Sequence, residues 1–338
     1  MPARRKLLLA AAAAPVLASA PVAGSARAQQ IAGGRTIRVI VPFPPGGAVD
    51  LLGRLIADRL PAQLGGQTVV VENRGGAGGL LGADAVAKAA PDGTTIGLIS
   101  VTTLCASPFL HSRMPFDPQK DLTPVTQVTD GSLLCVVNAE TARQRGWTDF
   151  RALIAWSKAN PEQVRMGSSG TGTTSHLNIS AINHLTGARI LHVPYRGGGP
   201  AIQDLLSGTI DMMFDVMPAL VPHVHSGKFK ALAVSSADRV PSLPDVPGMK
   251  EFADLGLGDH SVVSWNAIMT APRTPEPVVA QLARAVKAVA TEPSFGERLR
   301  PLGYSPTVSE SPAALARLIQ QETPKWRRMV ELSGARID

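Results

Sequence analysis

Apolar runs and amphipathic segments alternate along the first hundred residues of the chain. The continuous β-branched run at 36–43 (TIRVIVPF) predicts a buried strand. Leucine and isoleucine then recur at helical spacing, which predicts a helix through residue 63 that Pro61 bends or ends. The same rhythm continues with a strand, a helix and a strand at 67–73, 80–90 and 94–100. This alternation indicates a parallel, doubly wound α/β sheet.

The alternation restarts in the middle of the chain. The expected elements are a helix at 149–160, a strand, Gly/Ser/Thr loop and helix within 163–187, a strand at 189–195, a loop and helix at 197–208, strands at 210–215 and 262–272, and closing helices at 276–290 and 312–331. The chain is long for one ordinary core, so two closely joined lobes are expected. No low-complexity linker separates them, which favours a chain that crosses between the lobes more than once.

The N-terminus has the pattern of an export signal. Arg4, Arg5 and Lys6 precede an alanine-rich apolar core at 7–17, and Ala26-Arg27-Ala28 offers a small-x-small cleavage site. The apolar core is too short to span a membrane. We therefore expect residues 1–28 to be a signal peptide cleaved near Ala28, and the rest to be a soluble periplasmic protein.

Charge and cysteine content narrow the function classes. The whole chain carries a formal net charge of +7, but residues 1–28 hold four basic and no acidic residues, which leaves +3 (29 basic against 26 acidic). A nearly balanced domain with two tyrosines lacks the electrostatic footprint of a nucleic-acid binder. Cys105 and Cys135 show no metal-ligand spacing; export permits a disulfide, but buried free thiols are favoured.

Glycine-rich turns repeatedly separate a strand from a helix. They lie at 44–47 (PPGG), 75–79 (GGAGG), 167–174 (GSSGTGTT) and 197–200 (GGGP). Each exposes the unpaired amides of a first helical turn, and these form an anion site where no Cβ shields the backbone. In a parallel sheet such turns gather at one edge, where ligands bind. Tight turns explain any one of these loops, but their repetition favours a site for a carboxylate.

The catalytic alternatives have weaker support. There is no P-loop motif, and the glycines at 76–82 miss the dinucleotide spacing by one residue. GSSGT around Ser169 lacks the last glycine of a nucleophile elbow. His176 and Asp215 could complete a triad with a serine, although no motif specifies it. His223 and His225 have no further metal ligand nearby, and His192 is interpreted as a core histidine.

Three side chains beside these turns remain of interest. Asp50 lies in the first turn of a helix, where it either caps the helix or accepts a hydrogen bond from ligand or water. His176 begins the helix after the Ser/Thr loop. Tyr195 ends a strand at the same edge.

Several segments together resemble one family. PFPPGGAVDLLGRL, VVVENRGGAGGLLGADAVAKAAPDGTT, SSGTGTTSHL, HVPYRGGGPAIQDLLSGTIDMMFD and LPDVPGMKE occur in the order found in the Bug-type solute receptors of tripartite tricarboxylate transporters. The similarity runs from about residue 36 to the C-terminus. It implies a type II periplasmic binding fold: two doubly wound α/β lobes, joined by two crossing strands, with a ligand cleft between them.

The resemblance also implies how the chain is divided and used. Lobe 1 is expected at 29–131 and 263–338, lobe 2 at 132–262, and hinges near 131–137 and 260–266. A ligand carboxylate is then held largely by backbone amides and bridging waters from facing loops of both lobes. The residues expected to line the ligand site are Phe43, Pro44, Gly46, Gly47, Asp50, Thr102, Ser168, Ser169, Gly170, Thr171, Thr173, His176, Tyr195 and Asp215.

The function implied is that of an exported, monomeric receptor that passes a small carboxylate to membrane transporter subunits, without a cofactor, metal, nucleic acid or catalysis. Gly75 departs from the proline usual in this family, and Thr171, Thr173 and Thr174 stand where Asn or Ser is common, so the ligand stays open among dicarboxylates, tricarboxylates, amino acids and aromatic acids. Low aromatic content (4%) argues against a sugar. Two other functions remain open: a hydrolase-like α/β enzyme using Ser169 and His176, and a sensor that presents ligand to a signalling partner.

Overall fold

The computed structural model describes residue 31 and residues 34–337, so the predicted signal peptide lies outside the described residues. The strands are β1 (Ile37–Val41), β2 (Val69–Asn73), β3 (Thr95–Ser100), β4 (Thr123–Asn138), β5 (Arg165–Ser168), β6 (Leu191–Pro194), β7 (Met212–Val216), β8 (Phe229–Val234), β9 (Val263–Thr270) and β10 (Tyr304–Pro306). The α-helices are α1 (Ala48–Gln63), α2 (Leu80–Ala87), α3 (Val101–Cys105), α4 (Ser107–Leu110), α5 (Ala139–Arg145), α6 (Phe150–Ala159), α7 (Thr174–Thr186), α8 (Gly198–Ser207), α9 (Val221–His225), α10 (Glu276–Thr291), α11 (Pro293–Leu299) and α12 (Pro312–Ser333). Short 3-10 helices lie at Ala77–Gly79, Met217–Ala219, Met249–Leu255 and Arg300–Leu302.

Each strand and helix predicted from the hydrophobic pattern is present, with its ends shifted by a few residues. Pro61 does not end α1, which continues to Gln63. The pattern missed β4, the longest strand, because Asp130-Gly131 in its middle is a typical turn dipeptide. Tyr304 explains this glycine: a Cβ at Gly131 would lie 2.4 Å from the ring atom Cδ1 of Tyr304 on the paired strand β10.

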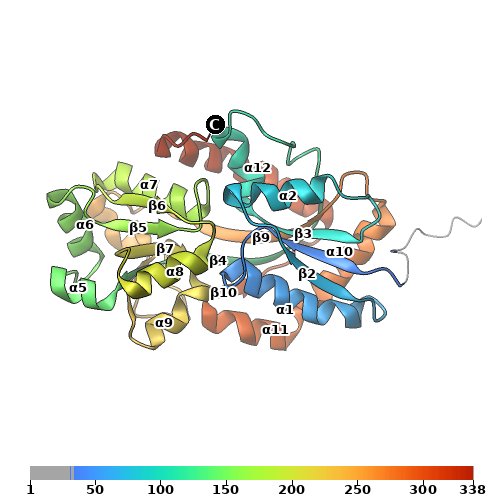
Figure 1. Cartoon of the computed structure of the whole chain (residues 1–338), viewed down its shortest axis with the longest axis horizontal. Coiled ribbons are helices and arrows are strands. Elements are labelled where there is room, and N and C mark those ends of the chain that lie inside the picture. The colour runs from blue at the N-terminus through green and yellow to red at the C-terminus, as the bar shows by residue number, and fades with distance from the viewer. Residues whose placement is uncertain (1–30, 32–33, 338) are drawn as a thin grey trace, which may run out of the picture.

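The strands form one sheet in the order β2-β1-β3-β9-β4-β7-β5-β6, and β8 and β10 both pair with β4 (Figure 1). The pairs β1–β2, β1–β3, β5–β6 and β5–β7 are parallel. The two central strands depart from the predicted parallel sheet, since β9 runs antiparallel to both β3 and β4. The sheet is therefore parallel toward each end and antiparallel in the middle.

Strand β4 joins the two ends of the sheet. Residues 123–132 pair with β9, whereas residues 133–138 pair with β7 and β8. We call β1, β2, β3 and β9 the first strand group, and β5, β6, β7 and β8 the second strand group. In Figure 1 the two groups lie side by side, with β4 between them.

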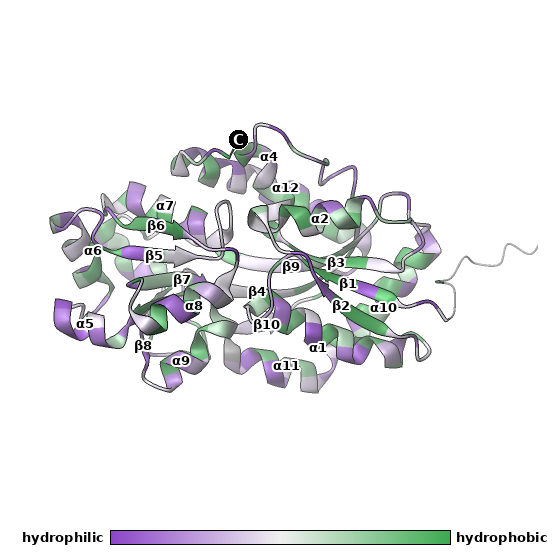
Figure 2. Ribbon diagram, viewed as in Figure 1, coloured by the Kyte–Doolittle hydropathy of each residue, from purple (hydrophilic) through white to green (hydrophobic). Residues whose placement is uncertain are grey.

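Helix α12 also connects the two strand groups. It packs against α3 and α7, which follow strands of the first and second group respectively. Trp326 of α12 is fully buried in a core cluster that contains both Leu104 of α3 and Leu177 of α7. In Figure 2, α12 carries both hydrophobic and hydrophilic residues, as expected for a helix with one buried face. Any movement of one strand group against the other must therefore slide or bend α12.

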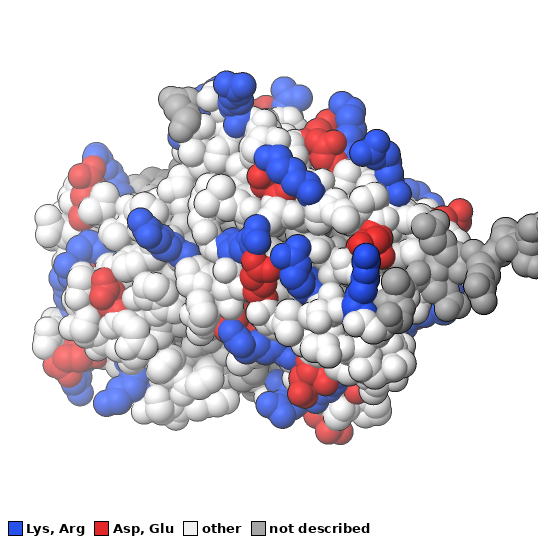
Figure 3. Space-filling view, turned by 45° about the vertical axis from the view of Figure 1, so that its right-hand side comes forward, with Lys and Arg blue, Asp and Glu red and all other residues white. Residues whose placement is uncertain are grey.

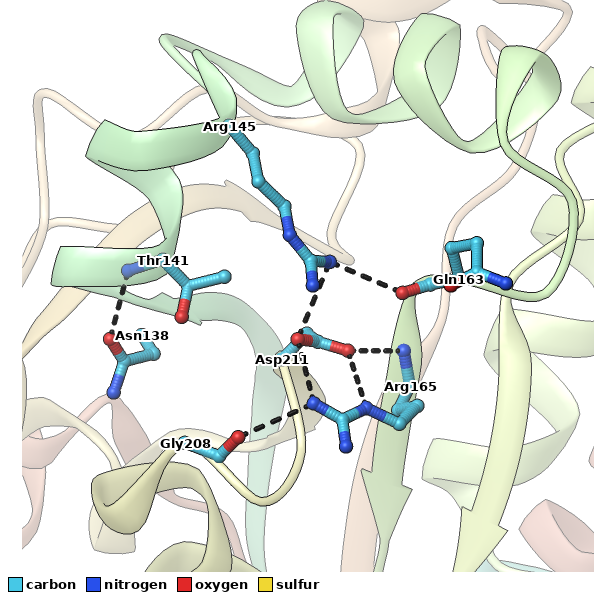
Figure 4. A network of polar contacts seen from close by, with 7 residues as sticks. All are labelled: Asn138, Thr141, Arg145, Gln163, Arg165, Gly208 and Asp211. Atoms are coloured by element: carbon cyan, nitrogen blue, oxygen red, sulfur yellow. Dashed lines mark hydrogen bonds and ion pairs between the residues drawn. The ribbon is translucent and has the colours of Figure 1, made fainter.

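A cluster of charged side chains lies at the start of strands β5 and β7. Asp211, which precedes β7, is buried and accepts hydrogen bonds from the backbone and the guanidinium of Arg165 and pairs with Arg145 at 3.4 Å (Figure 4). In the same region Asn138 caps α5 by accepting from Thr141 N. On the face drawn in Figure 3, acidic and basic side chains are scattered and intermixed.

Cys105 and Cys135 are both buried and free, which confirms the prediction of free thiols. Burial raises the pKa of Cys105 to about 12 and that of Cys135 further still. Both thiols are therefore protonated and unreactive at neutral pH. Within the described residues, no helix combines the length and the apolar composition of a membrane span.

Candidate functional site

A cavity lies between the two strand groups, where the carboxyl ends of their parallel strands meet. The cavity has a volume of about 50 Å³, which is room for a few water molecules. Its lining comes from segments far apart in sequence: Phe43, Gly47, Ala48, Val49, Ser100, Thr102, Ser169, Thr173, Thr174, Ser175, Gly198, Ile202, Met213, Asp215, Val216, Ala219, Leu220, Ser264, Asn266 and Tyr304.

Three helices of at least ten residues begin at the cavity wall, beside the shorter helix α3. They are α1, α7 and α8, whose N-caps Gly47, Thr173 and Gly197 make no side-chain hydrogen bond to the helix. Helices α5, α6 and α12, by contrast, are capped by side chains. The first intrahelical bonds of α1 and α7 are Leu51 N to Gly47 O and Leu177 N to Thr173 O, so the preceding amides lack a helical partner. The cavity thus receives unpaired amides and the positive ends of three helix dipoles.

No lysine, arginine or histidine occurs among the described residues that line the cavity. Its one carboxylate is Asp215, which is buried. Across the described part of the chain, no group of three or more potential ligand side chains is placed to hold a metal ion. An anion in this cavity would therefore be held by backbone amides and hydroxyl groups.

Glycines allow loops of the two strand groups to touch. A Cβ at Gly78 would lie 2.7 Å from the carbonyl oxygen of Thr171, and a Cβ at Gly197 would lie 2.9 Å from Cδ of Pro44. Gly47 lies opposite Gly198 and Gly199, whose amide nitrogens would be 3.9 Å from its Cβ. The loop at 44–47 therefore abuts the loop at 197–199, while 75–79 abuts the Ser/Thr loop.

The predicted site residues fall into four groups. Six of them line the cavity: Phe43, Gly47, Thr102, Ser169, Thr173 and Asp215. Gly170, Thr171 and Tyr195 line a neighbouring hollow together with Phe43 and Ser169. Gly46 and Asp50 face a separate surface hollow, and Pro44, Ser168 and His176 line none of these spaces.

Asp50 fixes the loop that precedes α1. Its carboxylate accepts hydrogen bonds from Gly46 N (3.0 Å), Arg54 Nε (3.0 Å) and Asn73 Nδ2 (2.8 Å). Burial alone would raise the pKa of Asp50, but these hydrogen bonds outweigh it and hold the pKa below its usual value. Since Gly46 has a φ of +89°, the bond from its amide stabilises a turn that favours glycine. The side chain is thus placed behind the cavity wall.

Ser168 and His176 organise the Ser/Thr loop from inside. His176 Nδ1 accepts from Gly172 N at 3.1 Å, and its ring stacks on His192 with centroids 4.0 Å apart. Ser168 Oγ lies 2.6 Å from His192 Nε2. Burial lowers the pKa of His176 to about 4 and that of His192 to about 3, so both rings are neutral at pH 7.

The geometry does not support a serine hydrolase at Ser169. Its hydroxyl donates to Asp215 in a short hydrogen bond, and the imidazole of His176 is occupied by the loop backbone. Tyr195 is also engaged, because its hydroxyl donates to Asp204 at 2.6 Å. A nucleophile–base pair of the kind needed for acyl transfer is therefore missing at Ser169.

Sequence reasoning missed the cavity wall formed by β9 and β10. Ser264 and Asn266 come from β9, and Tyr304 comes from β10. Asn266 and Tyr304 are each 1% exposed. The local signal for Asn266 was an amide side chain inside a mainly apolar strand.

The sequence matches one family of known proteins along most of its length. Residues 52–335 match the profile of the tripartite tricarboxylate transporter family receptor, TctC. The chain belongs to this family. BugT of Bordetella pertussis is 36% identical over 304 residues, which is 90% of each chain. The resemblance inferred from the motifs is thereby confirmed, and the family is one of transporter receptors rather than enzymes.

Solved structures of periplasmic binding proteins have the same fold as this chain. The chain is similar to the periplasmic binding protein BugD (32% identity, 89% and 98% of the two chains, TM-score 0.82). It is also similar to MatC of Rhodopseudomonas palustris with bound malate (33%, 88% and 99%, TM-score 0.80). A third is an R. palustris protein with adipate (30%, 90% and 99%, TM-score 0.84). The predicted α/β periplasmic binding fold is confirmed.

Proposed function

We propose that this receptor binds a small carboxylate in the cavity and delivers it to the membrane subunits of a tripartite transporter. The observation that carries the proposal is the meeting of three helix N-termini, none capped by a side chain, at a cavity whose described lining includes no basic residue. Such helix ends favour an anion and supply its hydrogen bonds directly. The malate and adipate bound by relatives have the same chemistry.

The ligand-binding residues in this proposal differ in their roles. Gly47, Thr102, Ser169 and Thr173 contact ligand or its bridging waters, and Phe43 supplies an apolar wall. Asp50, Ser168 and His176 position the loops. The hollow beside the cavity is lined by Gly170, Thr171 and Tyr195. This division predicts losses of affinity in the first set and losses of both stability and affinity in the second.

We further propose that lobe 1 comprises 29–131 and 263–338, that lobe 2 comprises 132–262, and that ligand holds them together. The change of partner along β4 after residue 132 supports this boundary. A ligand that touches both lobes stabilises the closed arrangement only through contacts absent from an open one. Because α12 packs on both sides, closure combines hinge bending near 131–137 and 260–266 with sliding along α12.

The pattern of residues 1–28 supports export to the periplasm and cleavage near Ala28. In the periplasm the receptor acts as a monomer without a cofactor. The N-terminal sequence of the protein recovered from the periplasm tests this. Recovery of uncleaved chain in the cytoplasm would contradict it.

A carboxylate screen tests the proposed function. At a ligand concentration about a hundredfold above Kd, binding adds about 2.7 kcal/mol to the free energy of unfolding and raises the melting temperature. We expect this effect from at least one small carboxylate and not from its methyl ester, with the compound recovered unchanged. Turnover of the compound, or equal stabilisation by acid and ester, would contradict the proposal.

A further inference from the structure

The wall of the cavity formed by β7, β9 and β10 carries polar side chains that the carboxylate site does not use. Tyr304 comes from β10 and lies across Gly131, while Asn266 comes from β9 and Asp215 from β7. All three side chains line the cavity and are at least nine-tenths buried. We call Asp215, Asn266 and Tyr304 the distal cluster.

Two atoms of the distal cluster make no hydrogen bond of good geometry to a described residue, although the Tyr304 hydroxyl interacts with the Asn266 side chain. They are the hydroxyl oxygen of Tyr304 and Oδ1 of Asn266. A buried polar atom without a partner costs free energy, so such atoms usually meet a ligand or an ordered water. Both residues line the cavity, so its contents are the available source of partners.

Asp215 makes this wall unfavourable for a second anion. Its carboxylate accepts from Ser169 Oγ and from its neighbour Val216 N (2.7 Å), and none of the described residues that line the cavity has a cationic side chain. Burial raises the pKa of Asp215, as expected for a carboxyl group without a cation, and burial together with the Asp215 charge raises the pKa of Tyr304. An ionised carboxylate placed beside this group would be a buried charge without a cation, and ionisation of Asp215 would repel it.

The hydrogen-bonding capacity that remains is specific. Asn266 Oδ1 and the free lone pairs of Asp215 accept, whereas the hydroxyl of Tyr304 both donates and accepts. A primary amide or a hydroxyl group satisfies this combination, because each donates and accepts. A carboxylate only accepts, so it would leave Asn266 Oδ1 without a donor.

We propose that the ligand carries one ionised carboxylate, held by the helix N-termini, and a second, hydrogen-bond-donating group that Asp215, Asn266 and Tyr304 recognise. The proposal rests on the proposed function and adds a substrate class: carboxylates with an amide or hydroxyl as the second polar group, rather than simple dicarboxylates. It also assigns specificity to three residues on strands β7, β9 and β10.

Matched pairs of compounds test this proposal. The probes are succinate, glutarate and adipate, each beside its monoamide, titrated by calorimetry into the purified protein at pH 7.5. For the chain length that fits, we expect the monoamide to bind at least tenfold more tightly than the diacid. Tyr304→Phe should weaken binding of the monoamide several-fold with little effect on the diacid.

Asp215→Asn should abolish the preference for the monoamide, because it removes the charge and introduces an amide donor in the same shape. Asp130→Asn is the matched control and should keep the preference, since Asp130 lies on β4 outside the cavity and its pKa is also raised by burial. Circular dichroism and melting temperatures verify that each variant is folded.

The outcomes separate this proposal from the one it rests on. Equal or tighter binding of a diacid by the wild type, or a preference that survives Asp215→Asn, would overturn the distal cluster and leave carboxylate binding intact. Failure of every acid and monoamide to bind would overturn the proposed function, and this inference with it.

Discussion

The loop before α1 should depend on Asp50 for its stability. Asp50→Ala removes the acceptor for Gly46 N, Asn73 Nδ2 and Arg54 Nε. A hydrogen bond to a charged group contributes about 1.5–3 kcal/mol. The total loss is smaller than three such bonds, because Gly46 is exposed, the Arg54 side chain is 54% exposed, and Asn73 retains Phe43 O at 2.9 Å. We expect about 2–4 kcal/mol in total, including the lost charge at the helix N-terminus.

Urea unfolding followed by tryptophan fluorescence measures this loss, and calorimetry measures the affinity for a carboxylate. Asp58→Ala is the control, since Asp58 is on the same helix with its side chain 81% exposed, and it should cost less than about 1 kcal/mol. The pKa of Asp50 is lowered on folding, so its stabilisation is present above the unfolded pKa of about 3.9 and is lost as pH falls through the folded value. The difference between wild type and Asp50→Ala should therefore shrink below about pH 4.

The reasoning is refuted if Asp50→Ala is no less stable than Asp58→Ala yet binds carboxylate at least tenfold more weakly. Asp50 would then be a direct ligand contact.

Three further predictions concern the loops. Gly47→Ala should bind carboxylate nearly normally, because the added Cβ makes ordinary contacts. Gly47→Val should lose binding while remaining folded, because its branches cover the amides of Gly198 and Gly199. Equal binding by the two variants would contradict an anion site at this loop. Gly78 has a φ of +64°, and a Cβ added there would lie 2.7 Å from Thr171 O, so Gly78→Ala should hold the lobes apart. Small-angle scattering should then show no compaction of the variant with ligand. Compaction as large as that of the wild type would refute the closed contact. The pKa of His192 is about 3 in the folded protein, below its unfolded value, so the free energy of unfolding should fall as pH drops from about 6.5 toward 4. His192→Gln should reduce this dependence on pH. An unchanged dependence in the variant would refute the role of His192.

The local pattern of hydrophobic and polar residues predicted the helices and strands well. Each helix buries one apolar face and each strand buries an apolar run, and both are visible in the local sequence. Strand β4 escaped because Asp130-Gly131 has local turn chemistry, whereas its glycine is needed by Tyr304, more than 170 residues later. The antiparallel middle of the sheet escaped for a similar reason. It is set by β9, which pairs with β3 and β4 across long sequence separations.

The glycine turns predicted a site at the carboxyl ends of the strands, where the structure has a cavity. The sequence pattern did not predict which side of each helix faces that cavity. Val49 faces the cavity, and Asp50, one residue or about 100° further around α1, turns toward Asn73 of β2. His176 turns inward from the cavity-lining Ser175 in the same way. Tyr304 and Asn266 were missed because tertiary folding alone brings them to the cavity.

The central claim is that backbone amides at helix N-termini hold the ligand carboxylate. A crystal structure of the complex with the tightest-binding carboxylate from the screen tests it most directly. We predict carboxylate oxygens within about 3 Å of amide nitrogens in the first turns of α1, α7 or α8, or of waters bound to them, with no lysine or arginine side chain in contact. A carboxylate paired with Arg54 or Arg298 in the outer hollow, or with any other cationic side chain, would contradict it.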